Sequence, residues 1–213
     1  MKKFGKYFSL LGVLLVGLST FVGVGTSVYA AENSNEPIVQ NVDDLDIQKM
    51  NEEQQREFLA LIDNEVNKSV YSSFGDKERF KEALISLFDS SSDTYQDLEK
   101  ASQQALPYST RAAHGWISNS VGAAAINVAL SALTGGIGSG LASYITKVGV
   151  STAKKVFQSR VKALFVKWGI KVAAGYYGTL FEIAMNVADP GGAISKYIDK
   201  HDKIPNNGYW EFS

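Results

Sequence analysis

Few side chains in this sequence could carry out acid–base, nucleophilic or metal chemistry. The chain has no cysteine and two histidines: His114 stands close to Trp116, and His201 lies in a charged tail. Neither histidine belongs to a serine-hydrolase or zinc-protease motif. Asp199, His201 and Asp202 form the one group with the composition of a metal site, and we expect them in a solvated loop instead. The sequence therefore predicts a protein that is not an enzyme and that holds no metal or cofactor.

The glycine-rich stretch TGGIGSGLAS is the next candidate for chemistry, as a phosphate-binding loop. A Walker loop needs a lysine and a hydroxyl residue after its last glycine, and a dinucleotide loop needs another glycine spacing. Neither pattern occurs here. We expect a turn between two close-packed helices, from about Ser118 to Leu133 and from Leu141 to Val148. For these residues taken alone, an alanine-rich core hairpin is the favoured interpretation, and a membrane hairpin is the alternative. The turn glycines are Gly135, Gly136, Gly138 and Gly140.

The most distinctive pattern is a row of bases beside an apolar helical face in STAKKVFQSRVKALFVKWGIK. We expect Ser151 to cap this helix. Helical spacing places large apolar residues on one face, the bases flank it, and the stretch has no acid. An interfacial helix needs this arrangement, because the aliphatic parts of the lysine and arginine side chains cover apolar surface while their charged ends reach lipid phosphate. Taken alone, such a helix is more often part of a core. The predicted membrane-binding residues are Lys155, Phe157, Arg160, Lys162, Leu164, Lys167, Trp168 and Lys171.

Charge divides the chain into three segments. Residues 1–30 hold three lysines and no acid, residues 31–111 hold 17 acids and 8 bases, and residues 112–213 hold 5 acids and 10 bases. The net charges are +3, −9 and +5. Such asymmetry indicates an interaction with a membrane, with a polyanion or between the two larger segments. Because no nucleic-acid-binding motif is present, nucleic acid is not an expected partner.

The elements that must position these residues are predicted to be helices, so the expected fold class is all-α. In the acidic segment, apolar residues recur every three or four positions along one stripe from Leu45 to Val66, and again from Phe80 to Phe88. We expect Gly75 and Asp76 to begin the second of these helices. A third, weaker helix is expected from Ser92 or Asp93 to Pro107.

The C-terminal part is predicted to add further helices and a returning arm. VAAGYYGTLFEIAMNVA is an apolar helix that ends before Asp189 and Pro190. A short helix follows. The turn residues Asn206, Asn207 and Gly208 then favour an end that folds back as a strand or arm.

The first thirty residues have the pattern of a secretory signal peptide. Lysines precede a long apolar run, and TSVYA provides small residues at the expected cleavage site after Ala30, with Ala31 as the next choice. An uncleaved N-terminal anchor is the alternative, because the apolar run approaches the length of a membrane span. We expect a secreted protein without disulfides, a habit typical of Gram-positive bacteria.

The order of export signal, acidic helices and basic apolar module resembles that of secreted precursors whose pro-segment masks a membrane-active peptide. The run LSALTGGIGSGLASYITKVGVSTAKKVFQSRVKALFVKW resembles the glycine-turned, lysine-rich helices of saposin-like bacteriocins. Those peptides are smaller than residues 112–213, and no double-glycine leader precedes this module. The resemblance implies that residues 112–213 bind and permeabilise anionic membranes, with the acidic segment 31–111 as internal partner and an immunity protein as a further partner.

Two further expectations concern how the segments are joined. The polar joint at Arg111 is a predicted processing site. Before processing, residues such as Phe58, Leu61, Phe80 and Leu84 would cover the apolar face of Phe157, Leu164 and Trp168. The alternative function is a non-enzymatic secreted binding or scaffold protein, in which the acidic and basic parts form one permanent domain.

Overall fold

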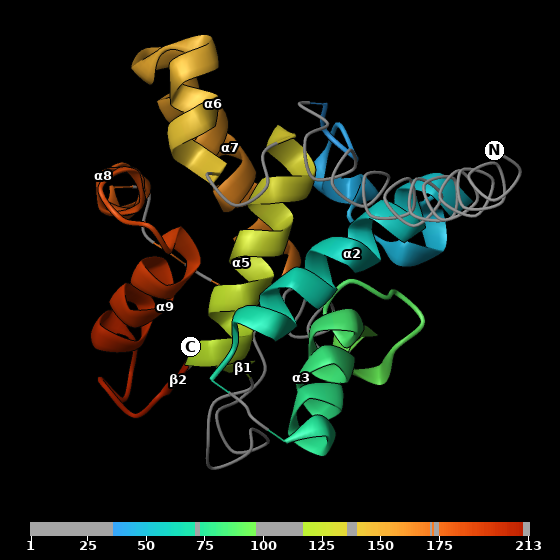
Figure 1. Cartoon of the computed structure of the whole chain (residues 1–213). Helices are drawn as coiled ribbons and strands as arrows, with labels where there is room; N and C mark the ends of the chain where they lie inside the picture. The colour runs from blue at the N-terminus through green and yellow to red at the C-terminus, as the bar shows by residue number, and fades with distance from the viewer. Residues whose placement is uncertain are drawn as a thin grey trace, which may run out of the picture. The chain divides into compact units, whose positions relative to one another are not determined.

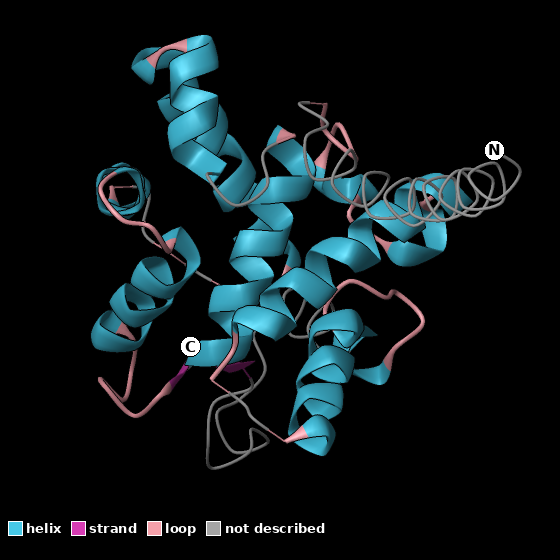
Figure 2. Cartoon of the chain, in the orientation of Figure 1, coloured by secondary structure: helices cyan, strands magenta, loops and turns pink. Residues whose placement is uncertain are grey.

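The computed structural model describes residues 36–70, 73–96, 117–135, 140–170, 172 and 175–210. Helices dominate these residues, and the strands are two residues long, so the predicted all-α fold is confirmed (Figures 1 and 2). Among the described residues, no helix combines the length and apolar composition that a membrane span requires. In chain order the elements are η1 (Val42–Asp44), η2 (Ile47–Lys49), α2 (Glu52–Lys68), α3 (Phe74–Ser86), β1 (Ile117–Ser118), α5 (Asn119–Thr134), α6 (Gly140–Val148), α7 (Val150–Lys167), α8 (Tyr176–Met185), α9 (Pro190–His201) and β2 (Tyr209–Trp210).

Helix α5 lies at the centre of the helices in Figure 1 and packs against α2, α3, α6, α7 and α9. It is the uncharged, alanine-rich segment of the sequence. The Ser118 side chain caps it by accepting a hydrogen bond from the Val121 N–H, and Gly135 ends it with φ 66°. The alanine-rich helix α5 is therefore buried at the centre of the hydrophobic core. Its buried residues include Ala124, Ala125, Ile126, Val128, Ala129, Leu130, Ala132 and Leu133.

Small residues let α9 approach α5 closely. A Cβ atom at Gly191 would collide with the Ala123 carbonyl oxygen of α5. The Gly191 N–H donates to Asn127 Oδ1 of α5 at 2.8 Å, and Asp189 caps α9 by accepting from the Gly192 N–H. The Asp-Pro-Gly-Gly sequence thus begins α9, with proline in its first turn. It does not end the preceding helix as predicted, because α8 already ends at Met185 with Asn186 as its C-cap.

The C-terminal arm folds back as predicted. Strand β2 pairs with β1 in antiparallel register, with Ile117 opposite Trp210 and Ser118 opposite Tyr209. The turn before it contains two residues with positive φ, Asn206 at 60° and Gly208 at 86°. Trp210 is completely buried, and its indole N–H donates to the Ser195 hydroxyl of α9 at 2.9 Å. The arm is therefore locked into the core at its last described residue.

Several predicted helix starts were wrong by a few residues. Helix α3 begins at Phe74 with Ser73 as its cap, in place of Gly75 and Asp76. Helix α7 begins at Val150, so Ser151 lies inside the helix and does not cap it. The predicted stripe from Leu45 to Val66 is divided between two 3-10 helices and α2. The division occurs at Asn51, whose side chain forms a capping box with Gln54 and so starts a new helix.

The weak third helix is described only at its start. Residues 93–96 are helical, and the Ser92 hydroxyl accepts a hydrogen bond from the Tyr95 N–H at 3.1 Å. This is the geometry of the predicted N-cap. The remainder of the predicted helix, to Pro107, lies outside the described residues.

The acidic and basic parts of the chain share one hydrophobic core. Phe88 follows α3, and its ring lies edge-on to Phe58 of α2 at 5.1 Å and edge-on to Trp168 at the end of α7 at 5.8 Å. Backbone bonds also join the two parts, because the Ile38 N–H donates to the Ala132 carbonyl at 2.8 Å. The C-terminal end of α7 is consequently covered by residues from the acidic segment, whereas the rest of its buried side packs against α5, α6 and α8.

Candidate functional site

Helix α7 carries six of the eight predicted membrane-binding residues, all except Trp168 and Lys171, and has two different sides. One side is buried and includes Ala153, Phe157, Val161, Leu164 and Phe165. The opposite side is exposed along a row with helical spacing, which we call the outer stripe: Lys155, Ser159, Lys162 and Val166. The helix contains five bases and no acid. The outer stripe therefore presents positive charge to the solvent.

A groove runs beside the outer stripe between α7 and α8. Its volume is ≈ 330 Å³, and it is lined by Lys155, Gln158, Ser159 and Lys162 of α7 and by Tyr177 of α8. Burial raises the pKa of the Tyr177 phenol, so this hydroxyl keeps its proton at neutral pH. All five lining side chains can donate hydrogen bonds, and none is an acid. The α7–α8 groove is thus suited to an anionic group such as a phosphate.

Lys167 lies on the other edge of α7, where segment 36–96 covers it. Its ammonium group donates to the carbonyl oxygens of Val42 at 3.2 Å and Leu45 at 2.7 Å, and it lies 5.3 Å from the centre of the Tyr95 ring. Burial lowers the pKa of Lys167 to about 8, although the nearby Asp46 carboxylate opposes this shift. In the folded protein this lysine binds the acidic segment and does not face solvent as Lys155 and Lys162 do.

Trp168 is also covered by the acidic segment. It is 1% exposed, its indole N–H donates to the Leu87 carbonyl at 3.4 Å, and its ring packs against Phe88 and Trp210. Leu164 and Phe157 are equally buried. Phe157 was predicted to pack on residues of the acidic helices. In the structure its ring packs against the ring of Phe181 of α8, with the ring centres 5.4 Å apart.

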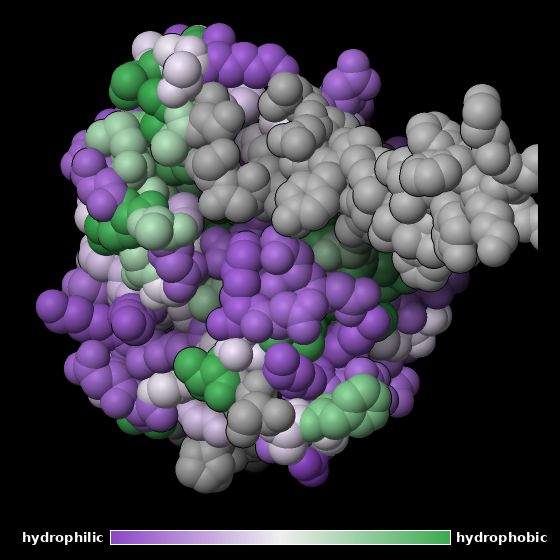
Figure 3. Space-filling view, in the orientation of Figure 1, coloured by the Kyte–Doolittle hydropathy of each residue, from purple (hydrophilic) through white to green (hydrophobic). Residues whose placement is uncertain are grey.

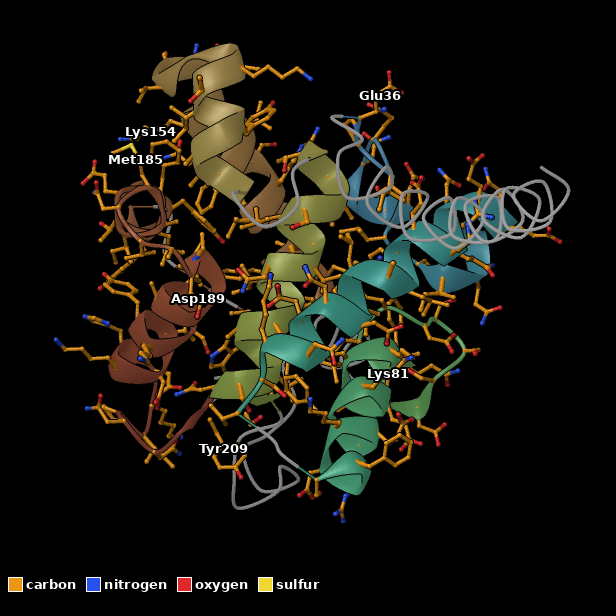
Figure 4. All side chains as sticks on the ribbon, in the orientation of Figure 1. Glu36, Lys81, Lys154, Met185, Asp189 and Tyr209 are labelled. Carbon is orange, nitrogen blue, oxygen red and sulfur yellow. The ribbon has the colours of Figure 1, made fainter. Side chains whose placement is uncertain are left out.

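The other bases of α7 are in different surroundings. Lys154 pairs with Glu182 of α8 at 3.1 Å and is labelled where α7 meets α8 in Figure 4. Arg160 faces a small apolar cavity, and its Nη1 atom is buried without a hydrogen-bond partner among the described residues. Burial lowers the pKa of the Arg160 guanidinium. The cavity is lined by Leu130, Thr134, Leu141, Tyr144, Phe157 and Arg160. Of the α7 bases, Lys155 and Lys162 are thus the two on the outer stripe.

Some predicted site residues fall where the structure gives no description. These are Ala30, Arg111, Gly136, Gly138 and Lys171, together with the predicted signal peptide. Two of the turn glycines are described: Gly135 ends α5 in the left-handed conformation, and Gly140 is the first residue of α6.

The candidate metal group has a structural role. Asp199 is buried in α9, and its carboxylate accepts hydrogen bonds from the N–H groups of Asn207 and Gly208 and from the Asn119 side chain. The expectation of a solvated loop was therefore wrong for Asp199, which anchors the C-terminal turn. His201 stacks on Tyr197 with a ring separation of 4.1 Å. Within the described ranges, no three His, Asp or Glu side chains gather as a metal site.

Sequence reasoning missed part of the α7–α8 groove. Ser159 could have been found, because it lies four residues after Lys155 and three before Lys162 on the same side of a helix. Tyr177 had no such signal, since it comes from α8 and meets α7 only through tertiary packing. Comparisons of the chain with protein-family models, with curated proteins and with solved structures found no match.

Proposed function

We propose that the protein is a secreted, bacteriocin-like protein whose folded form binds anionic membranes through the outer stripe of α7. Permeabilisation would follow when the acidic segment leaves α7. The α7–α8 groove carries the proposal, because two exposed lysines line it with three neutral hydrogen-bond donors and no acid. Secretion is inferred from the predicted signal peptide.

Electrostatics supports reversible binding of the folded form. Each lysine close to an anionic lipid surface contributes about 1 kcal/mol. Lys155 and Lys162 would therefore contribute about 2 kcal/mol together, while the pairing of Lys154 with Glu182 reduces its contribution. This is enough to concentrate the protein at a membrane, and too little to insert it.

Insertion would require the core to open. The predicted inserting residues Phe157, Leu164 and Trp168 are at most 2% exposed, and Trp168 is bonded to the backbone of the acidic segment. Burying one large apolar side chain gives about 1.5–3 kcal/mol, whereas an exposed ion pair gives about 0–1 kcal/mol. Apolar packing thus holds the acidic segment in place, and neither salt nor cleavage alone should release it without a membrane.

Co-sedimentation with vesicles tests the binding step. Residues 31–213 would be mixed with vesicles of phosphatidylglycerol and phosphatidylcholine, and with vesicles of phosphatidylcholine alone. We expect binding to the anionic vesicles only, and a loss of affinity of about 20- to 30-fold in the double variant Lys155→Gln/Lys162→Gln. The matched control is Arg56→Gln/Lys77→Gln, which removes the same charge from α2 and α3. Equal losses of affinity in the two variants would show that binding depends on the net charge of the protein alone and that the groove does not bind the membrane.

Dye release tests the permeabilisation step. A protease recognition sequence inserted after Arg111 allows the same protein to be compared before and after cleavage on anionic vesicles. We expect little release by the intact chain and release after cleavage. Equal release by both forms would contradict masking, and no release by either form would leave a membrane-binding protein without permeabilising activity.

The shared core supports a second candidate function, a non-enzymatic secreted binding or scaffold protein. Contacts such as those of Phe88 with Trp168 would then be permanent. The two candidates differ in the mass of the protein recovered from culture supernatant: a permanent domain stays at residues 31–213, and a precursor gives a shorter, processed form.

A further inference from the structure

We infer that the α6–α7 turn is the part of the folded protein that enters the headgroup region of an anionic membrane, with Val150 as its apolar tip. This inference rests on the proposed function and adds the orientation of the folded protein on the membrane. The tip consists of the end of α6, Gly149 and the first turn of α7. Figure 1 shows this connection at the upper edge of the molecule, with α6 and α7 side by side.

A single residue joins the two helices, which makes the tip rigid. Gly149 has φ 82°, a conformation that glycine adopts without strain. Its N–H donates to the Ile145 carbonyl at 2.8 Å, and its own carbonyl accepts from the Ala153 N–H at 3.0 Å. Gly149 is thus hydrogen-bonded to both helices, so Val150 is held at the end of the hairpin and needs little ordering when it meets a surface.

The tip combines apolar exposure with positive charge. Val150 is 53% exposed, and the side chains of Lys147 and Lys155 on either side of it are also exposed. Helices α6 and α7 together carry six bases and no acid. Figure 3 shows hydrophobic and hydrophilic residues next to each other at this upper end of the molecule. An apolar tip flanked by bases suits the boundary between lipid headgroups and acyl chains.

The α2–α3 connection exposes even more apolar surface, but its charges are different. Val70 is 94% exposed and Phe74 is 78% exposed. Two of the bases near them are paired with acids: Lys68 with Glu65 at 2.9 Å, and Arg79 with Asp76 at 2.8 Å. This connection also belongs to the acidic segment of the chain, which anionic lipid repels. Charge therefore selects the α6–α7 turn as the membrane contact.

The geometry of α7 sets which lysines accompany the tip. At about 1.5 Å per residue, Lys155 lies about 7.5 Å along the helix from Val150, and Lys162 lies about 18 Å from it. An interfacial segment enters a membrane by about 5–10 Å. Lys155 thus reaches the headgroups together with the tip, and Lys162 reaches them when the hairpin leans so that the outer stripe approaches the surface.

The absence of cysteine permits a direct test, because each introduced cysteine is the unique thiol of the chain. The NBD fluorophore would be attached to Val150→Cys and, as the matched control, to Val70→Cys in residues 31–213. On anionic vesicles we expect NBD emission to rise at least about twofold and to shift to shorter wavelength at position 150, with no change at position 70. Co-sedimentation of the same labelled proteins measures binding separately.

The outcomes separate this inference from the proposed function. Binding without an emission change at position 150, or with a larger change at position 70, overturns the inference and leaves membrane binding intact. No binding to anionic vesicles by the unlabelled protein refutes the proposed function itself, and the inference with it.

A charge substitution provides a second test without a label. Val150→Asp should weaken vesicle binding by about tenfold, because the carboxylate meets anionic headgroups and must be desolvated. The first turn of a helix tolerates aspartate well, so the fold should be retained, as circular dichroism would verify. The control is Val70→Asp in the α2–α3 connection, where Val70 is 94% exposed; we expect less than about a twofold effect. Equal losses in both variants overturn the inference.

Discussion

The buried lysine at the end of α7 predicts an unusual dependence of stability on pH. Lys167 has a folded-state pKa of about 8, lowered from 10.5 chiefly by burial. Asp43, Asp44 and Asp46 oppose this shift, and Lys49 adds to it. Between pH 8 and 10.5 the unfolded chain binds more protons than the folded chain. The free energy of unfolding should therefore rise with pH in this window, and the gain should be lost as the pH falls through 8.

The magnitude follows from the size of the shift. A lowering from 10.5 to about 8 corresponds to a change of about 2 kcal/mol in the free energy of unfolding between pH 7 and pH 9.5. Because the Lys167 side chain is only partly buried, solvent screening reduces this to about 1 kcal/mol. Above pH 10 the raised pKa values of Tyr177 and Tyr197 act in the opposite direction, so measurements should stop near pH 9.5.

Urea unfolding of residues 31–213, followed by tryptophan fluorescence between pH 7 and 9.5, measures this effect. Lys167→Met should lose the rise with pH, because it removes the titrating group. Lys162→Met is the matched control, since it removes an exposed lysine from the same helix and should keep the rise. A wild-type stability that is constant or falls over this range, or an equal rise in Lys167→Met, would refute the argument that Lys167 is buried as a cation against the Val42 and Leu45 carbonyls.

Two other substitutions test the packing of the core, one where α9 meets α5 and one at the end of α7. Gly191→Ala should destabilise the protein by about 1–3 kcal/mol, because the added methyl group collides with the Ala123 carbonyl. The control is Gly75→Ala on α3, where a Cβ meets nothing within 4 Å, and it should be neutral or stabilising. Thermal unfolding compares the two variants. Trp168→Ala should cost about 3–5 kcal/mol in urea unfolding, and a cost below about 1 kcal/mol would show that Trp168 is not a core residue.

The sequence alone was sufficient to predict most of the helices. The central helix was expected from about Ser118 to Leu133, and α5 spans Asn119–Thr134 with Ser118 as its cap. The returning C-terminal arm was also predicted, from the turn around Gly208. These features depend on caps, apolar periodicity and turn conformations. Such interactions involve residues within about four positions of one another, so the local sequence determines them.

Helix starts were less predictable because several residues competed for the same role. Ser73, Gly75 and Asp76 can each begin a helix, and the structure uses Ser73. At the start of α7 the N-cap is Gly149 and not Ser151, because Gly149 is the single residue between α6 and α7. The preference of serine for N-cap positions gives no information about where the preceding helix ends.

The environment of each functional side chain was decided only by the tertiary structure. Lys155 and Lys167 stand on the same helix, yet one is exposed and the other binds carbonyl groups more than 120 residues away along the chain. Likewise, the uncharged helix α5 has a composition that would suit either a membrane or a core. It is buried here because α2 and α9 pack against it, and burial is set by contacts between distant segments that a local pattern does not specify.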